Sequence, residues 1–190
     1  MYLLIKWLKV MKKINNFFIS IIVVLGLIGC SITPDEVIQT SLNGYTYNSL
    51  ARNYLDRPTE VSLRGDTFVV KVQGYGQDDI GMLTVDREDV DETVAALDKY
   101  LEWDSLATKR GDVITKNISK VGSYTYAIFG TKPGEHFFIS HIPVLGDHLD
   151  VNYVGQLAVL FPRDEVIELR KLLVQFKTNS FKRPDMSVYK

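Results

Sequence analysis

The sequence predicts an α+β fold in which antiparallel β-hairpins are covered by two amphipathic helices. Short runs rich in β-branched and aromatic residues are separated by turn residues, as in hairpins. Two longer segments, near residues 90–101 and 166–176, carry apolar residues three and four positions apart, the period of a helix with one buried face. Together these patterns are typical of the α+β class, with the helices lying on one face or seam of the strands.

Three strands are expected ahead of the first helix. Val61–Arg64 and Thr67–Val72 flank Gly65-Asp66, a two-residue sequence typical of a hairpin turn. A third run of strand-forming residues is Ile80–Val85. These residues therefore predict a hairpin followed by one more strand.

The first helix is expected to begin after Asp86 and to end at Gly111. Asp86 is a good N-cap residue, and the acidic residues that follow it suit the positive end of the helix dipole. Two basic residues before Gly111 match the negative end and a C-terminal stop. The predicted inward stripe consists of Val90, Val94, Leu97 and Leu101.

Strand patterns return after this helix and lead to a second one. Lys132-Pro133-Gly134-Glu135 has proline and glycine where a type II turn requires them. The second helix is expected to start after Pro162, and Thr178–Lys190 predicts a polar tail. The inward face of this helix should consist of Val166, Leu169, Leu173 and Phe176. The expected strands are Val113–Ile118, Tyr124–Phe129, Phe137–Ile142, Leu149–Val154 and Gln156–Phe161.

The two helix entries resemble each other. Gly81–Val85 leads into Arg87-Glu88-Asp89-Val90, and Gly155–Val159 leads, with two extra residues, into Arg163-Asp164-Glu165-Val166. We interpret this as an internal strand–strand–helix duplication, and the alternative is that strand–helix junctions reuse the same residue types. A duplicated plan of this kind is loosely similar to whirly-like single-strand-binding folds, in topology alone and without diagnostic residues.

The first residues have the three parts of an export signal. Lys12 and Lys13 form a positive region after Met11, which is an alternative start, and Phe17–Ile28 is uncharged and mostly apolar. A helix of about a dozen residues is too short to cross a hydrocarbon core of about 30 Å. A cleaved signal therefore fits this segment better than a permanent membrane helix.

The stretch Leu27-Ile28-Gly29-Cys30 resembles the lipobox of bacterial lipoproteins. In that family the signal is cut between the residues matching Gly29 and Cys30, and the cysteine receives diacylglycerol and becomes the acylated first residue. Ser31 differs from the aspartate that often retains such proteins in the inner membrane. The resemblance, which covers only the leader, therefore implies a lipid-anchored protein at the cell envelope. In a Gram-negative host it favours the periplasmic face of the outer membrane.

This leader sets the expected division of the chain and the charge of its body. Cleavage leaves 161 of the 190 residues and removes four lysines, so the formal charge falls from −1 to −5. An acidic body lacks the basic footprint of a general nucleic-acid binder, so no nucleic acid is expected as a partner. The expected segments are a signal peptide at 1–29, a lipidated cysteine and tether at 30–44, a globular domain at 45–177 and a polar tail at 178–190. If the chain is duplicated, the halves of the domain are 45–110 and 111–177.

No motif in the chain is typical of a particular enzymatic reaction, and no cofactor is expected. There is no Gly-x-Ser-x-Gly elbow, and Cys30 is the only cysteine. His141, Asp147 and His148 are weak candidates for a metal site or an unrecognised enzyme site near His141–Asp150, because they lack a metal-binding spacing. The simpler interpretation makes the histidines, His136 included, exposed residues of strand edges and loops.

The aromatic residues are the remaining candidates for binding. Tyr124 and Tyr126 alternate on one strand and so share a face, and Trp103 lies late in the first helix. Tyrosine and tryptophan are enriched at recognition surfaces, although half-buried sheet tyrosines would give the same pattern. We therefore expect a non-enzymatic, membrane-anchored module for envelope binding, assembly or protection, whose partner is an envelope protein. The alternatives are an enzyme or metal-binding domain and, less favoured, a single-strand nucleic-acid-binding domain.

Overall fold

The computed structural model describes residues 35–76, 79–141 and 158–181. Within these ranges the helical elements are the 3-10 turn η1 (Arg87–Asp89) and the helices α2 (Val90–Arg110) and α4 (Arg163–Lys177). The strands are β1 (Glu36–Ile38), β2 (Gly44–Asn48), β3 (Asn53–Arg57), β4 (Thr59–Arg64), β5 (Thr67–Gln73), β6 (Ile80–Asp86), β7 (Thr115–Val121), β8 (Tyr124–Lys132), β9 (Glu135–His141) and β10 (Val159–Pro162).

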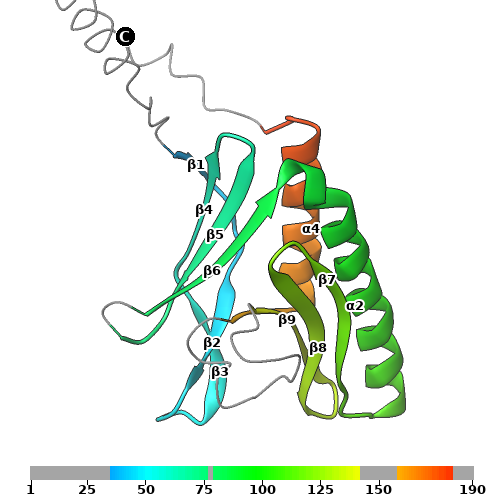
Figure 1. Ribbon diagram of the computed structural model, residues 1–190. Helices are drawn as coiled ribbons and strands as arrows, with labels where there is room; N and C mark the ends of the chain where they lie inside the picture. The colour runs from blue at the N-terminus through cyan, green and yellow to red at the C-terminus, as the bar shows by residue number, and fades with distance from the viewer. Residues whose placement is uncertain (1–34, 77–78, 142–157, 182–190) are drawn as a thin grey trace, which may run out of the picture. The chain divides into compact units, whose positions relative to one another are not determined.

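The strands form two antiparallel sheets, and the predicted α+β class is confirmed (Figure 1). One sheet has the order β1-β4-β5-β6, and the other has the order β3-β2-β10-β9-β8-β7. Helices α2 and α4 pack against each other beside the six-stranded sheet. Antiparallel strands followed by a helix occur twice among the described residues, as β4-β5-β6-α2 and as β7-β8-β9-β10-α4, with three strands in the first case and four in the second.

The β4–β5 hairpin and the β6–α2 junction follow local sequence signals. Gly65 has a φ of 59° between the paired residues Arg64 and Thr67, so the predicted turn is confirmed. Asp86 precedes η1 as predicted, but its carboxylate accepts a hydrogen bond from Thr67 Oγ1 at 2.6 Å instead of capping the helix. Asp86 thus joins the start of the helical segment to the neighbouring strand.

Both helices bury the predicted faces. In α2, Val90 and Leu97 are fully buried, whereas Val94 and Leu101 are partly buried against the same core. Gly111 ends the helix with a φ of 72°, as its position predicts. The four predicted residues of the inward face of α4 are all buried in that core: Val166, Leu169, Leu173 and Phe176.

Apolar residues gather on both faces of the six-stranded sheet. The larger cluster fills the space between the two sheets and the helices, and it includes Tyr126, Ile128 and Phe138. A second cluster, which includes Phe129 and Phe137, lies on the opposite face of β8 and β9. Six consecutive residues of β8 are buried for this reason, since a strand covered on both faces carries no alternating polar positions.

The structure corrects the start of the globular body. The predicted tether at 30–44 is wrong after Asp35, because Glu36–Ile38 pair with β4 as strand β1 and Leu42 is buried in the main core. Arg64 donates two hydrogen bonds to Asp35, at 2.9 and 2.8 Å, and holds this segment beside the β4–β5 turn. The folded body therefore begins near Asp35.

Three further differences concern strands. The β2–β3 hairpin was not expected from the sequence, and it joins the six-stranded sheet through β10. Strand β7 begins at Thr115 instead of Val113, and β10 begins at Val159, after Ala158, which was predicted to lie in the strand Gln156–Phe161. The predicted strand Leu149–Val154 and the tail after residue 181 lie outside the described residues.

Candidate functional site

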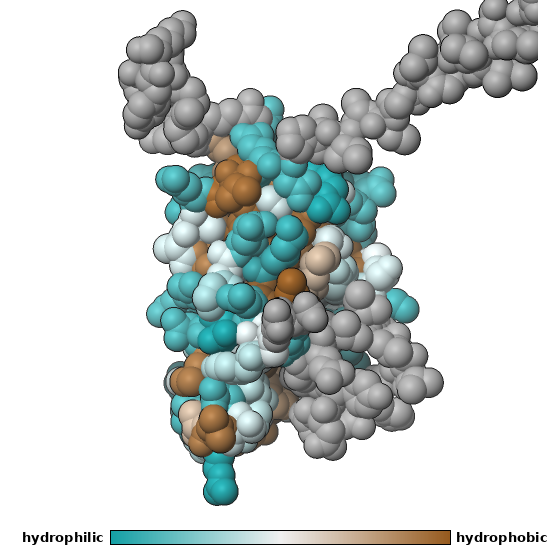
Figure 2. Space-filling view, turned by 90° about the vertical axis from the view of Figure 1, so that its left-hand side faces the viewer, coloured by the Kyte–Doolittle hydropathy of each residue, from teal (hydrophilic) through white to brown (hydrophobic). Residues whose placement is uncertain are grey.

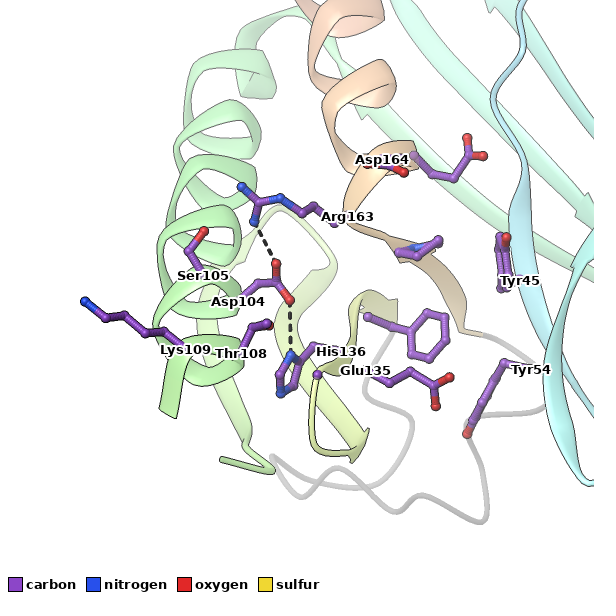
Figure 3. Close-up of a pocket in the computed structure, with 14 residues that line it drawn as sticks. Tyr45, Tyr54, Asp104, Ser105, Thr108, Lys109, Glu135, His136, Arg163 and Asp164 are labelled. Carbon is purple, nitrogen blue, oxygen red and sulfur yellow. Dashed lines mark hydrogen bonds and ion pairs between the residues drawn. The ribbon is translucent and has the colours of Figure 1, made fainter. Parts of the chain in front are cut away.

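A pocket of about 760 Å³ opens where α2 ends, where β8 turns into β9 and where α4 begins. One side of the pocket is formed by residues of α2 that include Asp104 and Lys109, and the opposite side includes Tyr45 and Tyr54 of the β2–β3 hairpin (Figure 3). The face seen in Figure 2 shows no comparable candidate for a binding surface, because its described residues are mostly hydrophilic and its apolar groups are separate from one another. The pocket is therefore the site that we consider.

The buried polar side chains of the pocket form a network around Asp104. His136 Nδ1 lies 3.1 Å from Asp104 Oδ1, and Arg163 Nη1 donates to Asp104 Oδ2 at 2.6 Å (Figure 3). The side chains of Asp104 and His136 are buried, whereas that of Arg163 is 45% exposed. One carboxylate thus binds a histidine from β9 and an arginine from α4, which satisfies the rule that buried charges are paired.

Both ring nitrogens of His136 have partners. Nε2 lies 3.0 Å from the carbonyl oxygen of Asp112, which only accepts, so this nitrogen carries a hydrogen. Because Nδ1 contacts Asp104, neither nitrogen can take a proton from a ligand without breaking an existing bond. The expectation that His136 is an exposed strand residue is therefore wrong, since this histidine joins β9, α2 and the segment after α2.

Helical spacing explains how α2 supplies this network. Tyr100 lies one turn before Asp104 and donates from its hydroxyl to the carbonyl of His136 at 2.8 Å. Burial raises the pKa of Tyr100, which therefore stays a neutral donor. Asp104 continues the buried stripe of the helix three residues after Leu101. An acid on an apolar stripe is the signal in the sequence that could have identified the site.

The opposite wall of the pocket combines aromatic rings with carboxylates. Phe137 has its ring centroid 5.9 Å from that of Tyr45 and 5.0 Å from that of Tyr54. Burial raises the pKa of Tyr54, and the nearby Tyr47 and Glu135 raise it further. Glu135 is itself partly buried, which raises its pKa, but hydrogen bonds from Thr131 and Lys132 outweigh burial and keep the pKa below its usual value.

Glu165 lies on the same wall at the start of α4. Its carboxylate accepts a hydrogen bond from the backbone N–H of Asn43 at 2.8 Å. The pKa of Glu165 is nevertheless raised, chiefly by burial and also by the charges of Asp164, Glu168 and Asp56. This wall therefore carries negative charge that its own hydrogen bond does not balance.

The predicted metal candidates are only partly visible. His141 ends β9 and is partly buried, which lowers its pKa, and its Nδ1 has no hydrogen-bond partner among the described residues. Asp147 and His148 lie outside the described residues. Within the described ranges, no three His, Cys, Asp or Glu side chains lie close enough together to hold a metal ion.

The predicted aromatic candidates lie away from this pocket. Tyr124 and Tyr126 share a face, as predicted, with parallel rings 6.4 Å apart. Both rings are largely buried, the Tyr124 hydroxyl accepts a hydrogen bond from the Thr84 N–H, and the two tyrosines line a second, smaller pocket of about 270 Å³. Trp103 is partly buried against the main core, and Lys116 Nζ lies 4.7 Å from its ring centroid. The sequence did not single out Tyr45 or Tyr54, the tyrosines that line the pocket.

No family model, curated protein or solved structure matches the chain. Among the residues that the structure describes, no helix is long and apolar enough to span a membrane. Gly29 and Cys30, the predicted cleavage and lipidation site, lie outside these residues.

Proposed function

We propose that the chain is a lipid-anchored protein of the bacterial cell envelope that acts by binding a partner, without catalysing a reaction. The anchor follows from the charged and apolar parts of the leader and from its lipobox-like end at Cys30. A lipid on that cysteine would hold the folded body at one membrane and raise its effective concentration for partners there.

The observation that carries the binding proposal is the position of the pocket. The first described residue, Asp35, lies beside the β4–β5 turn, and Asp66 in that turn bonds to Arg87 just ahead of α2. The pocket lies at the other end of α2, because Asp104, Thr108 and Lys109 in the last turns of this helix line it. A helix of 21 residues spans about 30 Å, so the pocket is far from the point where the chain enters the domain.

The chain between the proposed anchor and the domain is short. Glu36 follows Cys30 by six residues, and an extended chain of that length reaches about 20 Å. The β4–β5 end of the domain would therefore stay within about 20 Å of the anchor, and the pocket would lie about 30 Å from that end. A pocket in this position is accessible to partners beyond the membrane surface.

The chemistry of the pocket supports binding over catalysis. His136 is the group there best suited to proton transfer, and both of its ring nitrogens are already bonded. The described pocket also holds exposed and half-buried carboxylates next to aromatic rings, an arrangement that can recognise a ligand.

Labelled-palmitate incorporation followed by cell fractionation tests the anchor. The native chain should be labelled and found in the envelope, and Cys30→Ala should be unlabelled. Ser31→Ala is the matched control, because it changes the neighbouring residue and should keep the label. An unlabelled native protein in the cytoplasm would contradict the proposal and would favour the single-strand nucleic-acid-binding alternative.

One observation favours the second candidate, a metal or enzyme site near His141. The buried Nδ1 of His141 has no partner among the described residues, and a metal ion would supply one. Metal analysis of the purified full-length chain and of His141→Ala tests this candidate. Bound metal that disappears in the variant would support it, and equal metal content would contradict it.

A further inference from the structure

We infer that the pocket binds a primary ammonium group on an alkyl stem, held between Tyr45 and Tyr54 and the carboxylates of Glu135, Asp164 and Glu165. This inference rests on the proposed binding function and names the class of ligand that the same pocket would take. A lysine side chain of a peptide and a free diamine share this chemistry.

The charges of the pocket leave its carboxylate wall without a matching cation. Arg163 and His136 both bond to Asp104, so these three side chains form one closed group. Lys109 belongs to the α2 side of the pocket, and in Figure 3 its side chain points away from the tyrosine wall. The cationic residues that line the pocket therefore do not balance the acids on its far side.

Three acids, Asp56, Asp164 and Glu165, act together on the hydroxyl of Tyr45. The charges of Asp56, Glu165 and Asp164 all raise the pKa of Tyr45, after burial itself. Two of the same acids, Asp164 and Asp56, also raise the pKa of Glu165. The tyrosine and the glutamate thus experience the same negative potential. A positively charged ligand at this wall would lower the electrostatic energy of the site.

Lys132 and Thr131 bond to Glu135, yet this carboxylate still lines the pocket. In Figure 3 its oxygens point toward Tyr54, so one negative group and one ring face lie together. Two polar anchors, Glu135 and Glu165, therefore border the rings from different elements. An ammonium group is a compact cation with three donors and can bond to either carboxylate.

The aromatic rings provide a surface for the stem of the ligand. Tyr45 and Tyr54 are half-buried beside Phe137, so their rings are held in place while part of their surface stays open. Ring faces attract cations, and they also pack against methylene groups. The cavity of about 760 Å³ is large enough for a side chain or a small diamine.

Titration calorimetry on the full-length chain in detergent tests this inference. The first probe is a tripeptide with a central lysine, blocked at both ends, and the second is the same tripeptide with norleucine in place of lysine. The lysine peptide should bind at least about tenfold more tightly, because one charge-assisted hydrogen bond corresponds to more than that factor. Equal binding of the two peptides would overturn the inference.

Variants locate the site. Glu135→Gln combined with Glu165→Gln removes two charges, keeps an oxygen for the Asn43 N–H, and should weaken lysine-peptide binding about tenfold or more. The control is Glu102→Gln, an acid on α2 that pairs with Lys99 and does not line the pocket. A double variant that binds as the native protein does, or that matches the control, would overturn the inference. An unchanged thermal midpoint shows that each variant is folded.

A third probe, 1,5-diaminopentane, distinguishes the two sources of the ligand. Tighter binding of the diamine than of the peptide would assign the site to free amines, and the reverse order would assign it to peptides. Either order supports the ammonium site, whereas binding of neither compound overturns it. Palmitate labelling is independent of these titrations, so a failure of the anchor and a failure of the pocket give different results.

Discussion

Two arginines at matching positions of the sequence repeat show how burial changes the role of one residue type. Arg87 begins the turn η1 ahead of α2, Arg163 is the first residue of α4, and each bonds to a backbone carbonyl of the other helix. Arg87 also pairs with Asp66, whose side chain is 85% exposed, and Arg163 pairs with Asp104, whose side chain is 8% exposed. The pair Arg87–Asp66 is a surface clamp, by which we mean an exposed ion pair that joins the β4–β5 turn to the end of α4, and the pair Arg163–Asp104 is part of the pocket.

The comparison explains why the two ends of the domain differ. Arg87 also lies 4.2 Å above the ring of Phe176 and binds the last carbonyls of α4, where a cation suits the helix dipole. Its bonding groups are therefore used in joining α4 to the β4–β5 turn. At the other end, Asp104 has two partners, and Glu135, Asp164 and Glu165 line the pocket beside them.

The largest effect is expected for Asp104→Ala. This change removes the acceptor that Arg163 and the buried His136 share, and each buried polar group left without its partner typically costs about 1–3 kcal/mol, and more where it is charged. Urea unfolding of the full-length chain measures it. Asp104→Asn keeps an oxygen and should lose less. A loss below about 1 kcal/mol for the alanine variant would show that the network is not a buried pair.

A somewhat smaller loss is expected for Leu97→Ala. Leu97 is fully buried on α2, the helix that separates the two arginine sites, and a leucine-to-alanine change in a core typically costs about 2–5 kcal/mol. Leu106→Ala is the matched control on the same helix, because Leu106 is 54% exposed and should change stability by less than about 1 kcal/mol. Similar values for the two variants would show that α2 packs through another face.

Local signals in the sequence account for much of this framework. The β4–β5 turn, the start and end of α2 and the inward face of α4 each depend on residues close together in the chain, and all were predicted. Strand β1 was missed because its partner Val61 lies far from Ile38 in sequence, and few apolar residues mark the segment. Its pairing depends on tertiary contacts that no local pattern reveals.

The pocket was harder to predict for the same reason. Asp104 is 32 residues from His136 and 59 residues from Arg163, so only the packed fold brings them together. The lone histidines looked like exposed residues because their spacing matched no motif. The tyrosines that were singled out, Tyr124 and Tyr126, are the buried ones. Alternation correctly placed them on one face, but it could not show that the helices cover that face.

An intermediate effect is expected in alkali, where buried and exposed tyrosines should differ. Burial raises the pKa of Tyr126 to about 12, from 10.0 for a free tyrosine. The stability that this shift provides is complete below pH 10 and is lost as the pH rises toward 12, by up to about 3 kcal/mol. Urea unfolding at pH 8 and at pH 11.5 measures the loss.

Two variants connect the alkaline loss to the buried ring. Tyr126→Phe should show a smaller difference between the two pH values than the native chain does. Tyr47→Phe should behave as the native chain does, because Tyr47 is 46% exposed. An unchanged difference in Tyr126→Phe would assign the alkaline loss to other groups.

The smallest effect is expected for Asp66→Ala, the counterpart of Asp104→Ala. Asp66 pairs with Arg87 at 2.8 Å, but its carboxylate is largely in water, where such pairs contribute about 1 kcal/mol or less. Its backbone carbonyl, which accepts from the Arg87 N–H, is retained in the variant. Urea unfolding should therefore show a loss of less than about 1 kcal/mol.

A double-mutant cycle with Arg87→Ala isolates the ion pair from the other contacts of Arg87. Arg87→Ala alone should cost more than Asp66→Ala, because it also removes the bonds to the last carbonyls of α4 and the contact with the Phe176 ring. The coupling between the two changes should stay below about 1 kcal/mol and should decrease in high salt. If Asp66→Ala cost as much as Asp104→Ala, the two arginine sites would be equivalent, and burial would not be what distinguishes the clamp from the pocket.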